Sequence, residues 1–596
     1  MNRKDKTENS VNKVHVWSQF QNSIRLLGSQ KRRYMLLLLL ETLLNGLSPA
    51  ITLVITQQMI NALQTMKQDF QPVLLYVIFL TTFTAFIHVF QNSLNYWKER
   101  EEYLFEKNFH TRLLEKVSAM DCSDLENSDY YDLIDRTQYD ANAGILGNIK
   151  NTFSFFTALL GTFSYIFILA EYHLFLLIII ILTPSVRYFY EKKYNILSYR
   201  MIRENTEHRR RMSYYFRMLI DADCAKEIRM YRLSKLFTER YAQLKEHCDR
   251  KSLDISRKRL HMLFALEIVE QIIDFFCVLY LAKECFIGNL LVGSFILYSN
   301  SIDSAKQSLW NLFYMRSVLY KYASMLEQIQ SFLGLPEERC NQGGKSVGKI
   351  HTLEVRHLSY CYPNQTKKAL QDVNFIMHEG ELTVLMGYNG SGKSTLIKIL
   401  MGIYHNYEGD ILVNGINRRQ LDLELYRKKI SVVFQNYMKY ETCIAENIWY
   451  GDILRELHTE EVARMLKSAG LEGFLEEQNT ALGYQFCHGR QISIGEWQKL
   501  AVARGLYRKA DFYIMDEPNA SLDLLSEETV FRFIEKEAAN QMRLLIIHRF
   551  NHFAEAADQI LVLDSGRMAE HGRHQELMKI KGLYFRLYCA QNGPQT

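Results

Sequence analysis

Apolar residues are concentrated in the first half of the chain, in runs long enough to cross a membrane. A hydrocarbon core requires about 20 mostly apolar residues per helix. Runs of this kind lie near 34–56, 73–95, 152–171, 173–190, 260–283 and 290–312. The pattern predicts an all-α transmembrane bundle of about six helices within residues 1–333.

Lysine and arginine gather on one side of these predicted spans. They precede the first span and follow the second and the fourth, at 31–33, 98–100 and 191–193. Since basic residues favour the cytoplasmic side, we expect a multi-pass protein of the cell membrane with both termini in the cytoplasm. The two long connections on this side, 100–151 and 192–259, are charged but repeat apolar residues at helical spacing. They predict long cytoplasmic extensions of the membrane helices.

The second half of the chain has a different pattern. Residues 334–349 contain several glycines and a proline, which predicts a linker. From 350 to 596, short Val, Ile and Leu runs alternate with amphipathic segments. This alternation is typical of an α/β domain with a largely parallel sheet, so two structural domains joined by a linker are expected.

Charge and cysteine usage exclude several classes of protein. The formal net charge is only +5 over 596 residues, which argues against a dedicated nucleic-acid surface. The 10 cysteines are scattered, without the spacing of a zinc site or a disulfide framework.

A glycine-rich run in the second half carries the clearest chemistry. It has the spacing G-x-x-x-x-G-K-S, between the strand-like 382–386 and the helical 396–400. Glycines let backbone N–H groups surround phosphates, and the helix start adds its positive dipole end. Lys393 is expected to reach the β- and γ-phosphates, and the Ser394 hydroxyl to bind Mg²⁺. The candidate nucleotide-binding residues of this run are Gly387, Asn389, Gly390, Ser391, Gly392, Lys393, Ser394 and Thr395.

An apolar strand further along, at 511–515, ends in Asp516 and Glu517. Downstream of a phosphate-binding loop, Asp516 fits the acid that holds Mg²⁺ through water. Glu517 fits the base that polarises the attacking water. Together the two motifs predict an ATPase of the P-loop class.

The remaining motifs resemble, in their order, those of the nucleotide-binding domain of ABC transporters. The resemblance implies that Tyr362 stacks on adenine, that Gln435 senses Mg²⁺ and that His548 contacts the γ-phosphate. It also implies that Asp523 lies in a loop that communicates across a dimer of such domains. ATP and Mg²⁺ are the implied cofactors.

The segment 492–498 resembles the family signature Leu-Ser-Gly-Gly-Gln, with two departures. Ser493, Gly495 and Glu496 occupy signature positions, where the family binds ATP held by the other subunit. Ile494 replaces the first glycine and Glu496 the glutamine. A β-branched residue restricts close backbone approach, so a weaker composite site is expected. Both a homodimer that tolerates Ile494 and a heterodimer with one degenerate site remain open.

The order of membrane spans, then ATPase domain, resembles the exporter branch of the family. Residues 124–131 and 225–231 resemble the coupling helices of exporters, the second in the form of bacterial peptide and lanthipeptide exporters. The resemblance implies ATP-driven export by alternating access in a dimer, with a peptide as cargo. Glu267, Glu270 and Asp274 share one face of the fifth span, at i, i+3 and i+7. They either line a cavity for a cationic peptide or pair with nearby Arg and Lys.

Three alternatives accompany this hypothesis. A lipid or drug exporter would share the same motifs. An ATP-gated sensor or regulatory subunit without transport is favoured by Ile494 and opposed by Glu517 and His548. A soluble ABC-type ATPase acting on nucleic acid or ribosomes conflicts with the apolar spans.

Overall fold

The chain folds into two compact units, which are described separately. The computed structural model describes residues 16–28, 31–65, 70–125, 128–338, 344–362, 365–484, 486, 488–547 and 552–592. The first unit comprises Met1–Ala119 and Ser128–Leu335, and the second comprises Met120–Asn127 and Pro336–Thr596. The short segment that connects two long helices of the first unit therefore belongs to the second unit.

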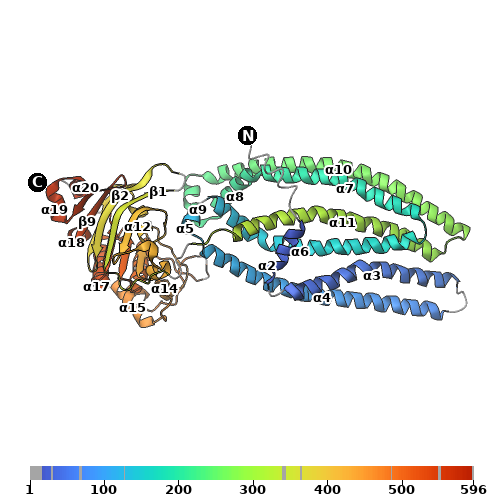
Figure 1. Cartoon of the computed structure of the whole chain (residues 1–596), viewed down its shortest axis with the longest axis horizontal. Coiled ribbons are helices and arrows are strands. Elements are labelled where there is room, and N and C mark those ends of the chain that lie inside the picture. Colours follow the sequence, from blue (N-terminus) through green and yellow to red (C-terminus); the bar gives the residue numbers. More distant parts are fainter. Residues whose placement is uncertain are drawn as a thin grey trace. The chain divides into compact units, whose positions relative to one another are not determined.

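The first unit is entirely helical in its described part, and several of its helices are very long (Figure 1). Its helices are α2 (Val16–Leu26), α3 (Lys31–Thr65), α4 (Gln71–Ser118), α6 (Ser128–Ala170), α7 (Leu174–Glu204), α8 (Thr206–Ile220), α9 (Ala222–Met230), α10 (Leu233–Ile287) and α11 (Val292–Leu333). Helix α11 packs along α6, α3 packs against both α4 and α6, and α10 packs against α7 and α8. The predicted class, a helical membrane domain with long helical extensions, is confirmed.

Apolar side chains of α3, α6, α7, α10 and α11 form a core in this unit. Leu169 of α6, Ile180 of α7, Leu281 of α10 and Ala305 of α11 are fully buried in one cluster. Other large apolar side chains, such as Phe79 of α4, are exposed. Exposed apolar surface on long helices is typical of segments that face lipid.

Among the described residues, three helical segments are long and apolar enough to cross a membrane: Lys31–Thr65, Gln71–Ser118 and Gly144–Ala170. They contain the first three predicted spans almost entirely. The other three predicted spans lie on α7, α10 and α11, and their insertion in the bilayer stays a prediction.

The second unit contains two sheets. The smaller is antiparallel with the order β2-β1-β4-β5, and the larger has the order β10-β9-β3-β8-β7-β6. In the larger sheet all pairings are parallel except that of β9 with β10. The strands are β1 (Thr352–Cys361), β2 (Lys368–His378), β3 (Leu382–Gly387), β4 (Glu408–Val413), β5 (Ile416–Asn417), β6 (Ile430–Val433), β7 (Phe512–Asp516), β8 (Met542–Ile546), β9 (Gln559–Asp564) and β10 (Arg567–Gly572).

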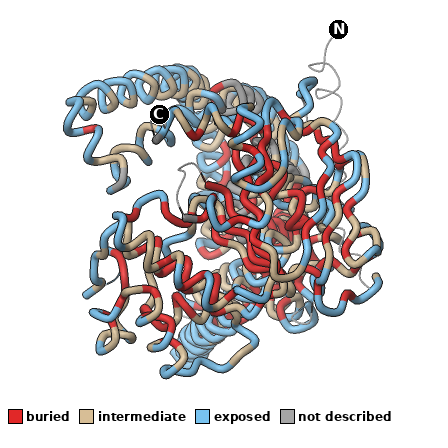
Figure 2. Tube along the Cα trace, turned by 90° about the vertical axis from the view of Figure 1, so that its left-hand side faces the viewer, coloured by how far each residue is buried: buried red, intermediate tan, exposed pale blue. Residues whose placement is uncertain are grey.

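Continuous burial of the central parallel strands explains why the sequence shows them as unbroken apolar runs. Strand β8, for example, is buried at every position, because helices cover both faces of such a sheet. Figure 2 shows buried residues gathered inside and exposed residues on the outer helices. The helices of this unit are α5 (Cys122–Leu125), α12 (Lys393–Leu400), α13 (Leu423–Lys428), α14 (Ile444–Trp449), α15 (Thr459–Ser468), α16 (Ile494–Tyr507), α17 (Leu524–Ala538), α18 (His552–Ala556), α19 (His574–Ile580) and α20 (Leu583–Asn592), with short 3₁₀ turns at Arg418–Gln420 and Glu472–Phe474.

Candidate active site

Three predicted site segments follow parallel strands and therefore meet at one edge of the larger sheet. The glycine-rich loop follows β3, Gln435 follows β6, and Glu517 follows β7 directly. The carboxyl ends of parallel strands are the usual position of ligand sites in α/β domains. The fold thus brings together segments whose outermost members, Gly387 and Glu517, are 130 residues apart in the chain.

Two glycines of the loop are required by its close packing. Gly387 ends β3 with a φ of +147°, and a Cβ there would lie 2.2 Å from the Leu563 carbonyl oxygen. Gly392 precedes α12 with a φ of +105°, and its Cβ would lie 2.8 Å from the Ala369 carbonyl oxygen. A side chain at either position would force backbone atoms apart, so the loop can hold this shape only with glycine.

Lys393 is buried at the start of α12 and bends back over its own loop. Its Nζ donates hydrogen bonds to the carbonyl oxygens of Gly387 (2.8 Å) and Tyr388 (3.0 Å). Burial lowers the pKa of Lys393, and the nearby charges of Asp516 and Glu517 partly oppose this. The ammonium group is thus held at the loop in a partly desolvated setting, where attraction to a polyanion is strong.

The loop also presents a polar group suited to an anion. The Ser391 hydroxyl oxygen is buried without a hydrogen-bond partner in the described structure. No acidic residue occupies the first turn of α12, where backbone N–H groups lack helical partners. A phosphate group would satisfy both donors.

Asp516 and Glu517 differ in surroundings although they are adjacent. Burial, and then the charge of Glu517, raise the pKa of Asp516 to about 6, while Lys393 opposes the shift. Glu517 has a φ of +51°, in the left-handed region that residues other than glycine seldom adopt. Its N–H donates to the Ile546 carbonyl of β8 (3.0 Å), which helps to hold this conformation.

The carboxylate of Glu517 accepts a hydrogen bond from the Nε2 atom of Gln435 (2.9 Å). Gln498 of α16 holds the backbone on the other side. Its Nε2 donates to the Glu517 carbonyl (2.9 Å), and its Oε1 accepts from the Ser521 N–H (2.8 Å). Gln498 is buried, and the sequence motifs did not identify its role. The sequence feature that could have indicated this role is the position of Gln498, three residues after Gly495 on a buried face of α16.

Tyr362 lies close to the loop helix through Thr395. Their hydroxyl groups are 2.9 Å apart. The Tyr362 ring also packs edge-on against Tyr360 and Tyr404, with centroids 5.2 and 5.7 Å away. The predicted adenine-stacking residue is thus fixed by aromatic contacts beside the phosphate-binding loop.

The signature segment forms the start of α16. Ser493 caps the helix: its hydroxyl accepts from the Glu496 N–H (3.2 Å), while the Glu496 carboxylate accepts from the Ser493 N–H (2.7 Å). This reciprocal capping explains why glutamate is accommodated at this position. Ile494 is the first helical residue, is 60% exposed and has no positive φ. Its backbone conformation therefore does not demand glycine. The Ile494 carbonyl accepts from the Tyr437 hydroxyl (3.0 Å).

The last two predicted residues differ in how far the structure describes them. Asp523 caps α17, and its carboxylate accepts from the Ser526 N–H (2.8 Å), a bond that lowers its pKa. His548 lies outside the described residues, directly after the described Ile547.

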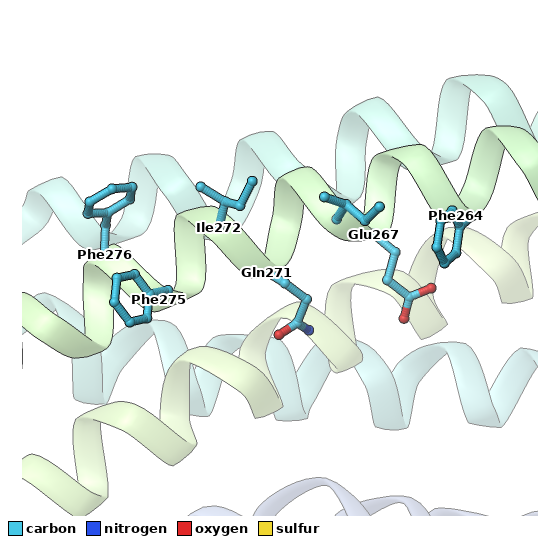
Figure 3. Close-up of a pocket in the computed structure, with 7 residues that line it drawn as sticks. Phe264, Glu267, Gln271, Ile272, Phe275 and Phe276 are labelled. Atoms are coloured by element: carbon cyan, nitrogen blue, oxygen red, sulfur yellow. The ribbon is translucent and has the colours of Figure 1, made fainter.

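The three acidic residues that share one face of the predicted fifth span have different surroundings. Glu270 pairs with Arg187 (3.5 Å) and Asp274 with Lys306, as the pairing interpretation expects. Glu267 instead lies in an open groove of about 590 Å³ along α10, lined by Phe264, Gln271 and Phe275 among others. Figure 3 shows Glu267 and Gln271 pointing to the same side of α10 and Phe276 to the other.

A P-loop ATPase domain that follows a domain of long membrane helices is the architecture of ABC exporters. Residues 370–520 match the family described as ABC transporter. The structure of a bacterial Atm1-family ABC exporter with ATP bound superposes with a TM-score of 0.74, covering 96% of this chain and 100% of the other at 20% identity. This likeness establishes the fold.

Two relatives align with nearly the whole chain, and a third aligns with about three fifths of it. The subtilin transport ATP-binding protein SpaT of Bacillus subtilis is 29% identical over 588 residues, covering 97% of this chain and 95% of SpaT. The nisin transport ATP-binding protein NisT of Lactococcus lactis subsp. lactis is 26% identical, covering 96% of both chains. An ATP-dependent lipid A-core flippase of Xanthomonas campestris pv. campestris is 30% identical over 61% of this chain and 62% of its own. The chain thus carries an ABC transporter nucleotide-binding domain fused to an N-terminal membrane domain.

Proposed function

We propose that this chain exports a peptide across the cytoplasmic membrane, driven by ATP hydrolysis in a dimer of such chains. The relatives named for subtilin and nisin transport align over nearly the whole chain, while the lipid A-core flippase aligns over about three fifths of it. Because the membrane domain determines the cargo, full-length similarity supports a peptide more strongly than a lipid.

ATP is held on the loop after β3 in this proposal. Lys393 contacts the β- and γ-phosphates, the Ser391 hydroxyl and the N-terminal N–H groups of α12 complete the phosphate site, and Tyr362 stacks on adenine. The remaining loop residues, Gly387, Asn389, Gly390, Gly392 and Thr395, shape the loop or approach the nucleotide.

The site suits Mg²⁺ in its choice of donors. The ion would be held by Ser394, by Gln435 and, through water, by Asp516, together with phosphate oxygens. Bound there, Mg²⁺ would neutralise charge on those oxygens. The amide nitrogen of Gln435 donates to Glu517, so its amide oxygen is the atom that would bind the ion.

Glu517 acts as the base that orients and polarises the attacking water, and His548 contacts the γ-phosphate. Gln435 positions the Glu517 carboxylate from one side, and Gln498 fixes the Glu517 backbone from the other. The γ-phosphate of ATP on one chain is also contacted by Ser493, Gly495 and Glu496 of the second chain, and Asp523 lies beside that interface. Closure of the two ATPase domains then moves the membrane helices from inward to outward access.

The convergence of Lys393, Gln435 and Glu517 at one sheet edge carries this proposal. Its test is ATP hydrolysis by the chain purified alone into lipid nanodiscs, beside Glu517→Gln. Loss of the base should lower kcat by about 10²-fold or more, because general base catalysis contributes about 10²–10⁴-fold. ATP affinity should change little, since the amide keeps the size of the side chain.

Glu528→Gln is the matched control. Glu528 is a surface carboxylate of α17 that pairs with Arg532 one turn away, so its loss should leave turnover unchanged. Equal activity of wild type and Glu517→Gln would contradict the role of Glu517. Absence of activity in both would favour a missing partner half or a regulatory role.

Cargo is tested by stimulation of this activity. Added nisin or subtilin should raise ATP turnover, and lipid A in the same nanodiscs should not. The opposite response would support the lipid exporter.

A further inference from the structure

A cluster of four ionisable side chains in the second unit joins two connections that come from the membrane domain. One connection is the turn at α5, which the chain enters from α4 and leaves into α6. The other is the start of the linker that follows α11. The cluster consists of Asp121 of the turn, Glu338 of the linker, and His405 and Arg427 of the ATPase domain.

His405 lies between the two carboxylates. Its Nε2 is 3.3 Å from Oε1 of Glu338 and 3.9 Å from Oδ2 of Asp121. Arg427 holds Glu338 with two hydrogen bonds, of 2.8 and 2.6 Å, and also donates to the Gly402 carbonyl (2.6 Å). Burial alone would raise the pKa of Glu338, but the bonds from Arg427 and His405 hold that pKa below its usual range. The linker carboxylate is therefore fixed in its charged form.

The turn is also ordered by Asp121. The Oδ1 atom of Asp121 accepts hydrogen bonds from the N–H and the hydroxyl of Ser123, both at 2.8 Å, while its other oxygen faces His405. Just before the two connections reach this cluster, they are tied to each other: Lys116 of α4 donates to the Leu335 carbonyl (2.7 Å). A displacement of the turn would thus be transmitted to the linker, and the reverse.

Tyr404, the residue before His405, contacts residues of the candidate nucleotide site. The Tyr404 ring stacks on Tyr360, with centroids 5.3 Å apart and planes 1° from parallel, and meets Tyr362 edge-on at 5.7 Å. Lys398 of α12 donates to the Tyr404 hydroxyl (3.0 Å). Tyr404 therefore contacts both the candidate adenine-stacking residue and the helix that starts at the phosphate loop.

We propose that Tyr404 and His405 form a positioning element that connects ATP binding at Tyr362 and α12 to the turn at α5 and to the linker. The proposal rests on the proposed function, because it concerns how ATP occupancy is communicated to the membrane helices. His405 contacts no nucleotide in this role; it acts through Asp121 and Glu338. Packed side chains and hydrogen bonds that run continuously between two sites can carry energetic coupling between them.

The native Cys122, exposed in α5 next to Asp121, provides the readout. The full chain carrying Glu517→Gln, which retains ATP, is reconstituted in nanodiscs and treated with a maleimide. Modification of Cys122 is then followed by peptide mass spectrometry with and without Mg-ATP. ATP should change the rate of modification by about fivefold or more, the range typical of coupled sites.

Adding His405→Ala should remove most of this change, with ATP affinity kept within about threefold of the parent, a shift well below one tenfold step in binding. His405→Gln should restore the response in part, because its amide nitrogen takes about the place of Nε2. Asp121→Asn should weaken the response while still accepting the bonds from Ser123. His351→Ala is the control, since it breaks a comparable exposed pair with Glu379 (2.6 Å) in the same domain.

Two results would overturn the proposal: an unchanged ATP response in His405→Ala and Asp121→Asn, or no response of Cys122 in a parent that binds ATP. Failure of the parent to bind ATP would instead overturn the proposed function, and with it the basis of this inference. If His405→Ala does not fold, Asp121→Asn and His405→Gln decide between these outcomes.

Discussion

Asp516 is a carboxylate whose surroundings oppose its charge until a cation is present. Burial and the neighbouring Glu517 raise its pKa to about 6 from an ordinary value of 3.8. The protonated form is therefore favoured in the folded state, and its contribution to stability is complete below about pH 4. That contribution is lost as the pH rises through about 6, and the loss amounts to about 3 kcal/mol.

We therefore predict that Asp516→Asn stabilises the metal-free and nucleotide-free protein at pH 8 by about 1–3 kcal/mol, and by almost nothing at pH 4. Thermal unfolding in nanodiscs at the two pH values measures the difference. Asp564→Asn, which removes an exposed carboxylate at the end of β9, is the control for the substitution itself. A stabilisation of equal size at both pH values would contradict the raised pKa.

At the scale of single residues, the sequence gives its clearest predictions where a motif has a fixed spacing. Gly392, Lys393 and Ser394 are predicted nucleotide-site residues because a phosphate loop has one arrangement of glycines. The double hydrogen bond of Gln498 was not foreseen, because it depends on where α16 packs against the segment after β7. Tertiary contacts of this kind leave no local pattern.

At the scale of helices, the pair between Asp274 of α10 and Lys306 of α11 joins two neighbouring segments. Both side chains are largely withdrawn from solvent. Removing one partner leaves an uncompensated charge in an apolar setting, whereas removing both leaves none.

The prediction is a double-mutant cycle. Lys306→Met and Asp274→Leu should each lower stability by about 3 kcal/mol, and the double variant by less than either single variant. Thermal unfolding of the three variants in nanodiscs measures this. Arg211→Met with Glu207→Leu, an exposed pair on α8, is the control and should show almost no coupling. Additive losses at Asp274 and Lys306 would show that the two charges act independently.

Helices and strands were predicted well where burial leaves a simple pattern of apolar residues in the sequence. The strands of the parallel sheet are buried on both faces and read as apolar runs. Assigning Met120–Asn127 to the ATPase unit required contacts with His405, nearly 300 residues away, which a periodicity cannot reveal. The fifth and sixth predicted spans, on α10 and α11, are more weakly marked in the sequence, because charged residues such as Glu270 and Lys306 interrupt their apolar runs.

At the scale of the whole molecule, Ile494 raised the question of whether two identical chains can form a working pair. Its ordinary backbone conformation and its exposed side chain are compatible with a functional signature helix. Most oligomers are symmetric homo-oligomers, which also favours the homodimer.

We predict that wild-type and Glu517→Gln chains, coexpressed and purified together, hydrolyse ATP in proportion to the square of the wild-type fraction. Two equal fractions should then give about a quarter of the full rate, because a symmetric dimer needs both copies of the base. Mixing with Glu528→Gln should leave the rate unchanged. A linear decrease would mean that the two sites work independently.

The left-handed backbone of Glu517 also limits how this site can change during evolution. Residues tolerate a φ of +51° unequally: asparagine, aspartate and glycine adopt it readily, and β-branched residues do so at a cost of about 1–3 kcal/mol. A lineage that loses hydrolysis at this position while keeping the fold can therefore change it to glutamine, aspartate, asparagine or glycine. Valine, isoleucine or threonine would destabilise the strand end, so an inactivated descendant should retain a small or polar residue there.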